Sequence, residues 1–201
     1  MRTVIRSARI LALCGLICAC AVPYRGGARA VQPTQLDATS WLRAAPTPVV
    51  RQKHMTDCGL AALAMVAGAW GRQWSIDDLA HRVPPGEHGI KLGVLRDLAR
   101  SRGLEAYAIK ANRDDLTTEL AAGRSVLLGL ILPHDRKRNR SHYEVAIALN
   151  RSDGTLITID PATGEWMRRS PAVLDLEWKA AGYAALVVTS DKPPQETAST
   201  K

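Results

Sequence analysis

Hydrophobic positions along the chain group into helical and strand-like runs. The clearest run, from Gly59 to Trp70, is apolar at nearly every position, so as a helix it would be buried on all sides. Ser75 is a typical cap before a second helical run, and Gly103 and Gly123 are typical stops after two more. We expect helices at about 58–70, 75–82, 91–102 and 113–122, and strands near 105–110, 125–132, 142–149, 154–160 and 183–189.

Two of these strands predict a hairpin. The run from His142 places every second residue, beginning with Tyr143, on one face, and residues 150–154 (NRSDG) are a clear turn signal. The following run, TLITID, ends at Asp160. Antiparallel pairing would bring the end of the second strand beside the start of the first. We therefore expect Asp160 and His142 to be neighbours.

Composition describes one ordinary globular domain preceded by a leader. The 201 residues are 46% hydrophobic and 23% charged. Within residues 1–30, three arginines precede an apolar run from residue 10 to about 22, which is the build of an export signal. A lipobox-like stretch favours cleavage before Cys20, which would then be lipidated; the alternative is cleavage after Ala30. We expect a leader at 1–30, a linker at 31–46, the domain at 47–189 and a flexible tail at 190–201.

Removal of the leader changes the charge and the cysteine count. The formal charge is +8, but five of the positive charges are arginines of residues 1–30, so residues 31–201 carry only +3. So small a positive charge gives little reason to predict nucleic-acid binding, and we expect no nucleic-acid partner. Three of the four cysteines lie in the leader, which leaves Cys58 without an intramolecular disulfide partner in residues 31–201.

The position of Cys58 indicates a nucleophile. A lone thiol is most often a small buried hydrophobe. Cys58, however, begins the buried helix, with Asp57 before it as a cap. Unpaired backbone N–H groups and the helix dipole favour a thiolate there.

A cysteine nucleophile needs a base and a group that orients the base. Of the five histidines, only His142 begins a strand-like run; His54 lies on the incoming segment, and the remaining three lie in loop-like stretches. Asp160 is the carboxylate that the hairpin brings to it. The chain has no CxxC or HxxxH pair, so we expect no metal, and no cofactor motif is present.

These residues resemble a known family. The elements of the resemblance, in chain order, are Gln52-x4-Asp57-Cys58-Gly59, His142-Tyr143, Asp160-Pro161-x-x-Gly164 and Leu176-x-Trp178. Together they resemble the C39 peptidases, the papain-like bacteriocin-processing domains, over roughly residues 47–189. The resemblance implies an α+β, papain-like cysteine peptidase fold, in which an N-terminal helical part carrying the cysteine packs on an antiparallel sheet carrying histidine and aspartate.

The resemblance also implies roles and partners. Cys58 would be the nucleophile, His142 the base, Asp160 its orienting group and Gln52 an oxyanion donor. The implied function is an exported cysteine peptidase acting on a peptide or small protein, with cleavage after Gly-Gly and association with an export system as its finer expectations. The alternatives are a peptidoglycan-directed cysteine endopeptidase or amidase, and a catalytically silent peptide-binding lipoprotein. The leader predicts a place in the cell envelope: periplasmic, or anchored in the outer membrane through Cys20.

Overall fold

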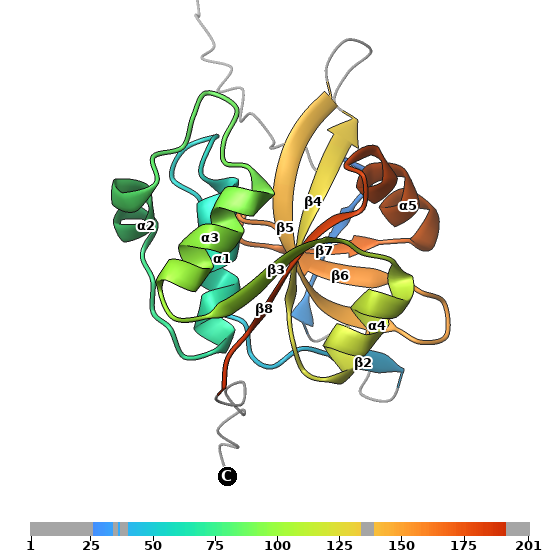
Figure 1. Ribbon diagram of the computed structural model, residues 1–201. Helices are drawn as coiled ribbons and strands as arrows, with labels where there is room; N and C mark the ends of the chain where they lie inside the picture. Colours follow the sequence, from blue (N-terminus) through green and yellow to red (C-terminus); the bar gives the residue numbers. More distant parts are fainter. Residues whose placement is uncertain (1–25, 34–35, 37–39, 134–138, 192–201) are drawn as a thin grey trace, which may run out of the picture.

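The computed structural model describes residues 26–33, 36, 40–133 and 139–191. Within these ranges, eight strands form a single sheet, and five helices cover its two faces (Figure 1). The expected leader cleavage before Cys20 and most of the expected tail lie outside the described residues. Among the described residues, no helix is long and apolar enough to cross a membrane.

Helix α1 (Cys58–Ala69) is the buried helix that the apolar run predicts. Every residue of it except Gly68 is buried, and it packs against β5 (Asn139–Asn150). Asp57 stands at the cap position, but its side chain makes no capping bond to the helix. Instead, Asp57 Oδ2 accepts the backbone N–H of His54 at 2.9 Å, so the carboxylate shapes the loop before the helix. The capping part of the prediction was wrong.

The remaining predicted helices are confirmed with small shifts at their ends. Helix α2 starts after the capping Ser75, whose hydroxyl accepts the N–H of Asp78. Helix α4 starts at a reciprocal capping box in which Asn112 and Asp115 accept each other's backbone N–H. Their bounds are α2 Ile76–Arg82, α3 Leu92–Ser101 and α4 Arg113–Ala121.

The predicted hairpin is confirmed. Strands β5 and β6 pair antiparallel, with Val145 opposite Ile159 and a register shift between Ala146 and Ala148. Asp160 follows the last residue of β6, which places it at the same edge as the first half of β5. The other predicted strands are also present, with bounds β3 Glu105–Lys110, β4 Val126–Pro133, β6 Leu156–Ile159 and β8 Ala184–Thr189.

Four elements go beyond the predictions. Strand β7 (Trp166–Arg169) pairs with β6, and helix α5 (Pro171–Ala180) follows it behind the capping Ser170. Two short N-terminal strands extend the sheet: β1 (Arg29–Val31) pairs with β7, and β2 (Trp41–Arg43) pairs with β5. The segment expected to be a linker thus contributes one whole strand and the end of another.

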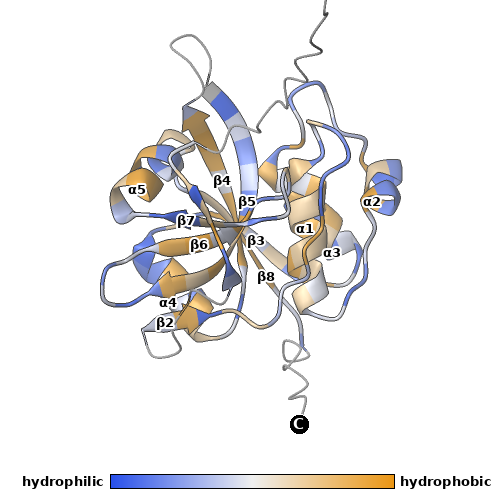
Figure 2. Ribbon diagram, turned by 180° about the vertical axis from the view of Figure 1, so that it is seen from behind, coloured by the Kyte–Doolittle hydropathy of each residue, from blue (hydrophilic) through white to orange (hydrophobic). Residues whose placement is uncertain are grey.

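The sheet separates two hydrophobic cores. Its order is β1-β7-β6-β5-β4-β8-β3, with β2 added to β5. Helices α1, α2 and α3 cover one face, and α4 and α5 cover the other (Figure 1). Strand β4 serves both cores, because Leu127 faces the first while Leu128 and Leu130 face the second. Figure 2 shows that α1 is hydrophobic along most of its length, whereas α2 on the same face is largely hydrophilic. The predicted α+β class is confirmed: the N-terminal helices, of which α1 carries the cysteine, pack on the antiparallel sheet.

Candidate active site

Cys58 lies where α1 meets β5. Its side chain is buried, with 7% of the residue exposed, and it is the first residue of the helix. The backbone N–H groups of Gly59 and Tyr143 donate to its sulfur, and both lower the pKa of the thiol. The sequence predicted the donor from the helix start; the donor from the strand comes from packing.

Glycine at position 59 permits this close packing. A Cβ atom there would lie 3.1 Å from both the ring of Tyr143 and the side chain of Leu95. Such distances are tighter than ordinary van der Waals contact, so a larger residue would push the helix start away from β5. The Asp-Cys-Gly order is therefore a packing requirement as well as a chemical one.

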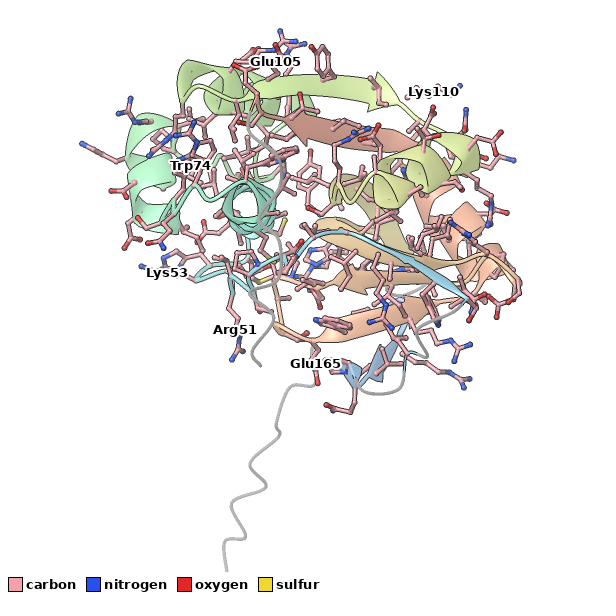
Figure 3. All side chains as sticks on the ribbon, turned by 90° about the horizontal axis from the view of Figure 1, so that it is seen from below. Arg51, Lys53, Trp74, Glu105, Lys110 and Glu165 are labelled. Carbon is pink, nitrogen blue, oxygen red and sulfur yellow. The ribbon has the colours of Figure 1, made fainter. Side chains whose placement is uncertain are left out.

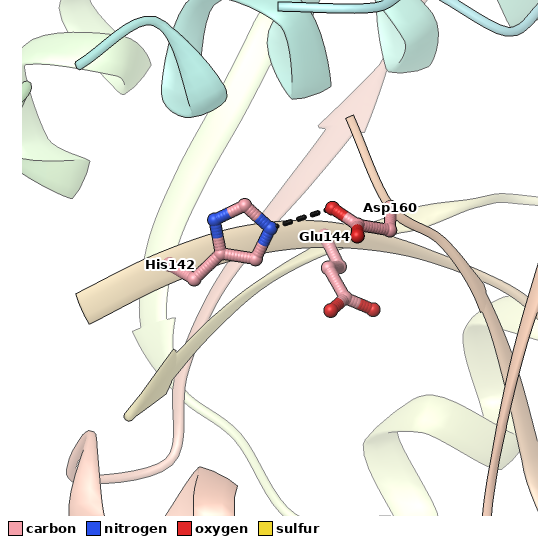
Figure 4. Close-up of side chains that lie close together, drawn as sticks. All are labelled: His142, Glu144 and Asp160. Atoms are coloured by element: carbon pink, nitrogen blue, oxygen red, sulfur yellow. Dashed lines mark hydrogen bonds and ion pairs between the residues drawn. The ribbon is translucent and has the colours of Figure 1, made fainter. Parts of the chain in front are cut away.

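His142 and Asp160 form the predicted pair. The imidazole Nε2 and Asp160 Oδ1 are 2.7 Å apart, and both side chains are buried (Figure 4). Asp160 also accepts the N–H of Ala162 at 2.8 Å, which fixes its orientation. Burial alone would raise the pKa of Asp160. The hydrogen bond and charge of His142, together with the N–H of Ala162 and the charge of Arg169, outweigh burial and hold that pKa below its usual value.

The remaining ring nitrogen of His142 is available to the thiol. Nε2 is engaged with Asp160, and the buried Nδ1 bonds no nitrogen or oxygen atom. In Figure 4 this nitrogen points away from Asp160. Cys58 interacts with the imidazole, so Nδ1 is the atom that would exchange a proton with the sulfur.

The electrostatics favour a thiolate–imidazolium pair. Burial opposes charge on Cys58, but the hydrogen bond and charge of His142, together with the two backbone donors, lower the pKa of the thiol below its ordinary 9.0. Burial likewise opposes the imidazolium. Hydrogen bonds to Asp160 and Cys58 and the charge of Glu144 nevertheless raise the pKa of His142 to about 10. A lowered thiol pKa beside a raised imidazole pKa favours the ionised form of the pair, with a thiolate on Cys58 and an imidazolium on His142.

Gln52 lies in the segment before α1, six positions ahead of the thiol. Its backbone N–H donates to Pro161 O at 2.8 Å, which ties this segment to the loop that carries Asp160. Its side-chain Nε2 donates to His54 O at 2.9 Å, and its Oε1 is buried without a hydrogen-bond partner. The structure thus brings Gln52 to the Asp160 loop, and its predicted role as an oxyanion donor stays a prediction.

The two segments that carry Gln52 and Asp160 pack against each other on one side of the site. A Cβ atom at Gly164 would lie 2.9 Å from the Arg51 side chain, and Gly164 has a positive φ of 73°. Figure 3 shows Arg51, Lys53 and Glu165 on the same side of the molecule. The Asp-Pro-x-x-Gly pattern therefore holds Asp160 and also receives the chain that leads to Cys58.

The other histidines stand apart from this pair. His54, His81 and His88 are exposed, and His81 lies in the last turn of α2 rather than in a loop. His134 lies outside the described residues. Of the described histidines, His142 is the buried one that meets both a carboxylate and the thiol.

Sequence reasoning missed two buried charged groups behind the imidazole. Glu144 Oε2 lies 2.6 Å from Nη1 of Arg169, and both residues are almost fully buried. His142, Glu144 and Asp160 each bring one potential metal ligand atom within 4.8 Å of the others. Both Glu144 oxygens already bond Arg169, however, and Nε2 already bonds Asp160. The sequence held a signal for Glu144: it is two residues from His142 on the same strand, so the two side chains share one strand face.

Comparison with known proteins agrees with this geometry. The sequence profile described as Peptidase C39 family matches residues 46–192. The probable microcin-H47 secretion/processing ATP-binding protein MchF of Escherichia coli is 27% identical over 117 residues, which cover 58% of this chain and 15% of that protein. This chain therefore corresponds to a small part of that curated relative.

Two solved structures share the fold. The peptidase domain of Streptococcus ComA, a bifunctional ABC transporter, has a TM-score of 0.59 at 24% identity, covering 73% of this chain and all of that one. A double glycine motif protease from an AMS/PCAT transporter, solved with its leader peptide, has a TM-score of 0.58 at 18% identity, covering 74% of this chain and 94% of that one. With the family match extending over most of the chain, these findings show that the protein belongs to the Peptidase C39 family.

Proposed function

We propose that the protein is a cysteine peptidase that hydrolyses peptide bonds with Cys58 as nucleophile. The observation that carries the proposal is the buried 2.7 Å contact between His142 and Asp160, next to a thiol at the start of a helix. A catalytically silent binding protein would have no use for a thiol whose pKa is lowered by an imidazole.

The chemistry follows from the ionised pair. The Cys58 thiolate attacks the substrate carbonyl carbon and forms a tetrahedral oxyanion. The His142 imidazolium then gives its proton to the leaving amine, the C–N bond breaks, and an acyl-thioester remains on Cys58. Neutral His142 next takes a proton from water, whose oxygen attacks the thioester and displaces the thiolate as the carboxylic acid forms. Asp160 keeps the imidazole oriented through both steps.

The oxyanion needs two donors on one side of the sulfur. The first backbone N–H groups of α1 have no partner within the helix, so they supply one. The side-chain amide of Gln52 is the second in this proposal. It now bonds His54 O, and rotation toward the sulfur when substrate arrives would exchange that bond for one to the oxyanion.

For the substrate, we propose a leader peptide cut after Gly-Gly. The support comes from relatives: the curated match is described as a secretion/processing protein, and one fold neighbour is described as a double glycine motif protease in complex with a leader peptide. Such a substrate would come from a secreted peptide or small protein, and association with an export system is part of the proposal.

The test is cleavage of a synthetic leader peptide that ends in Gly-Gly followed by a short reporter. We expect mass spectrometry to find a single cut after the second glycine. A peptide with both glycines replaced by valine should remain intact, and Cys58→Ala and His142→Ala proteins should leave both peptides intact. Cleavage of muropeptides in place of both leader peptides would assign the protein to peptidoglycan instead.

For location, we propose an envelope protein that is cleaved before Cys20 and lipidated there. Cleavage after Ala30 would divide β1, which pairs residue by residue with β7, and would remove Gly27, whose N–H donates to the buried Glu177 at 2.6 Å. Mass spectrometry of the mature N-terminus should find an acylated Cys20, and fractionation should find the protein with the outer membrane. A free N-terminus at Val31 would contradict this proposal.

A further inference from the structure

Behind the imidazole lies a buried network of charged side chains that the mechanism above does not use. Arg169, on β7, donates Nη1 and Nη2 to the two oxygens of Glu144 at 2.6 and 2.7 Å. It donates Nε to Glu177, on α5, at 2.7 Å. The hydroxyl of Thr158, on β6, lies 2.7 Å from Arg169 Nη1 and also bonds Glu144. All four residues are at most 1% exposed.

Glu144 is the member of this network that faces the active site. It is two residues from His142 on β5, so the two side chains share one face of the sheet. An oxygen of Glu144 lies within 4.8 Å of a ring nitrogen of His142 and of a carboxylate oxygen of Asp160 (Figure 4). At that distance, and away from water, a carboxylate acts strongly on an imidazolium.

The network carries one net negative charge, because a single guanidinium lies between two carboxylates. The charged groups that act on His142 directly are Cys58 on α1, Asp160 after β6 and Glu144 on β5 itself. Behind Glu144 stand Arg169 on β7 and Glu177 on α5. On β4, the residue opposite His142 is the apolar Leu130.

Buried ion networks are weak evidence for stability, because removing charges from water is expensive. Hydrophobic residues could fill this space at lower cost. A buried network of three charges, one of which lies within 4.8 Å of the catalytic pair, therefore calls for a role in the chemistry.

We propose that Glu144 is a positioning residue that keeps His142 as an imidazolium opposite the Cys58 thiolate, and that Arg169 holds Glu144 in place. The proposal rests on the proposed function, since it concerns the same catalytic pair. It adds a second carboxylate to the control of the base: Asp160 orients the ring through a hydrogen bond, while Glu144 acts through space.

The test is an NMR titration of His142 in the full chain labelled with ¹⁵N-histidine, which needs no substrate. In the wild-type protein we expect the ring to titrate far above 6.5, the ordinary value for histidine. Glu144→Gln should lower this midpoint by about one unit or more, a tenfold loss in proton affinity. Glu144→Asp, which keeps the charge, should recover most of the rise. Glu105→Gln, the same change at an exposed position on the edge strand β3, should leave the midpoint unchanged.

If Glu144→Gln does not fold, a triple variant provides the measurement. Glu144→Gln with Arg169→Met and Glu177→Gln removes all three charges together, leaves none unpaired, and should lower the midpoint in the same direction. A wild-type midpoint near 6.5, or an unchanged midpoint in the variants, would overturn the proposal. Failure of leader-peptide cleavage leaves this titration unaffected, so the two proposals fail separately.

Discussion

At the scale of single residues, the reactivity of Cys58 is decided by groups that are distant in the sequence. The helix start supplies one backbone donor, and β5 supplies both the imidazole and a second backbone donor. Burial alone would raise the pKa of the thiol, yet these groups together lower it. The lowered thiol pKa, on which the proposed nucleophilic role depends, therefore comes from the neighbours of the sulfur.

The first prediction concerns alkylation of Cys58. Iodoacetamide should modify it at pH 7 several-fold faster than it modifies the same cysteine in urea, because only the folded chain has the lowered thiol pKa. Peptide mapping by mass spectrometry separates Cys58 from the leader cysteines. His142→Ala should bring the rate down toward that of ordinary cysteine, and equal rates in the folded and unfolded chain would identify Cys58 as an inert buried thiol.

The second prediction ranks the supporting residues. Asp160→Asn should leave more peptidase activity than His142→Ala, because orienting a base is a smaller task than being one. Gln52→Ala should lower kcat about 10²–10³-fold, the usual loss for one oxyanion donor. Both are measured as kcat and KM on the leader peptide. A fatal His54→Ala together with an active His142→Ala would show that the base is wrongly assigned.

At the scale of elements, the site depends on how closely α1 approaches its neighbours. Helix α1 has a glycine near each of its ends. Gly59, near the start, faces β5, and Gly68, near the end, faces the segment that leads to Gln52. Glycine lowers the stability of a helix interior by about 1 kcal/mol relative to alanine. Glycine is present at these two positions because a side chain there would collide with Tyr143 of β5 or with Pro48.

The third prediction compares two glycine-to-alanine changes. A Cβ atom at Gly68 would lie 2.3 Å from Cγ of Pro48, so Gly68→Ala should lower the free energy of unfolding by about 1–3 kcal/mol despite the better helix propensity. Gly93, in α3, has no atom within 4 Å of such a Cβ, so Gly93→Ala should raise that free energy by up to about 1 kcal/mol. Urea denaturation measures both changes, and equal effects would show that the Pro48 contact does not matter.

At the scale of the whole molecule, one sheet lies between two hydrophobic cores and brings part of the site to α1. The first core holds α1 and its thiol, and the hairpin β5–β6 brings the imidazole and the carboxylate from the sheet. The second core covers the opposite face and contains Trp178, which is fully buried on α5. Stability and the geometry of the site are therefore coupled through the same strands.

The fourth prediction concerns how the free energy of unfolding depends on pH through Asp160, which lies at the end of the hairpin. The folded pKa of Asp160 is below its ordinary 3.8, so its stabilising contribution is present above about pH 4 and is lost as the pH falls through the folded value. Asp160→Asn should lower the free energy of unfolding by about 2 kcal/mol at pH 7, the value of a hydrogen bond to a charged group. The difference from wild type should shrink below pH 4. Asp191→Asn, an exposed control, should differ little from wild type at any pH, and a difference for Asp160→Asn that persisted at pH 2 would contradict the linkage.

The sequence by itself determined the parts of this protein that depend on short-range patterns. The apolar run after Cys58 predicted a buried helix with a thiol at its start, and the hairpin between 142 and 160 predicted the contact of His142 with Asp160; both depend only on local periodicity and a turn. The order of these residues was also sufficient for the resemblance to the C39 peptidases.

Only the tertiary structure decided the features that join distant segments. Strands β1 and β2 are three residues each, too short for a periodic signal. They exist because β7 and the end of β5 offer them backbone edges with which to pair. Glu144 and Arg169 read as ordinary polar residues in the sequence, and a buried ion network appears only when three strands and α5 bring its members together. Charge on an imidazole depends on every group within a few ångströms, whatever its distance along the chain, and no local pattern contains that information.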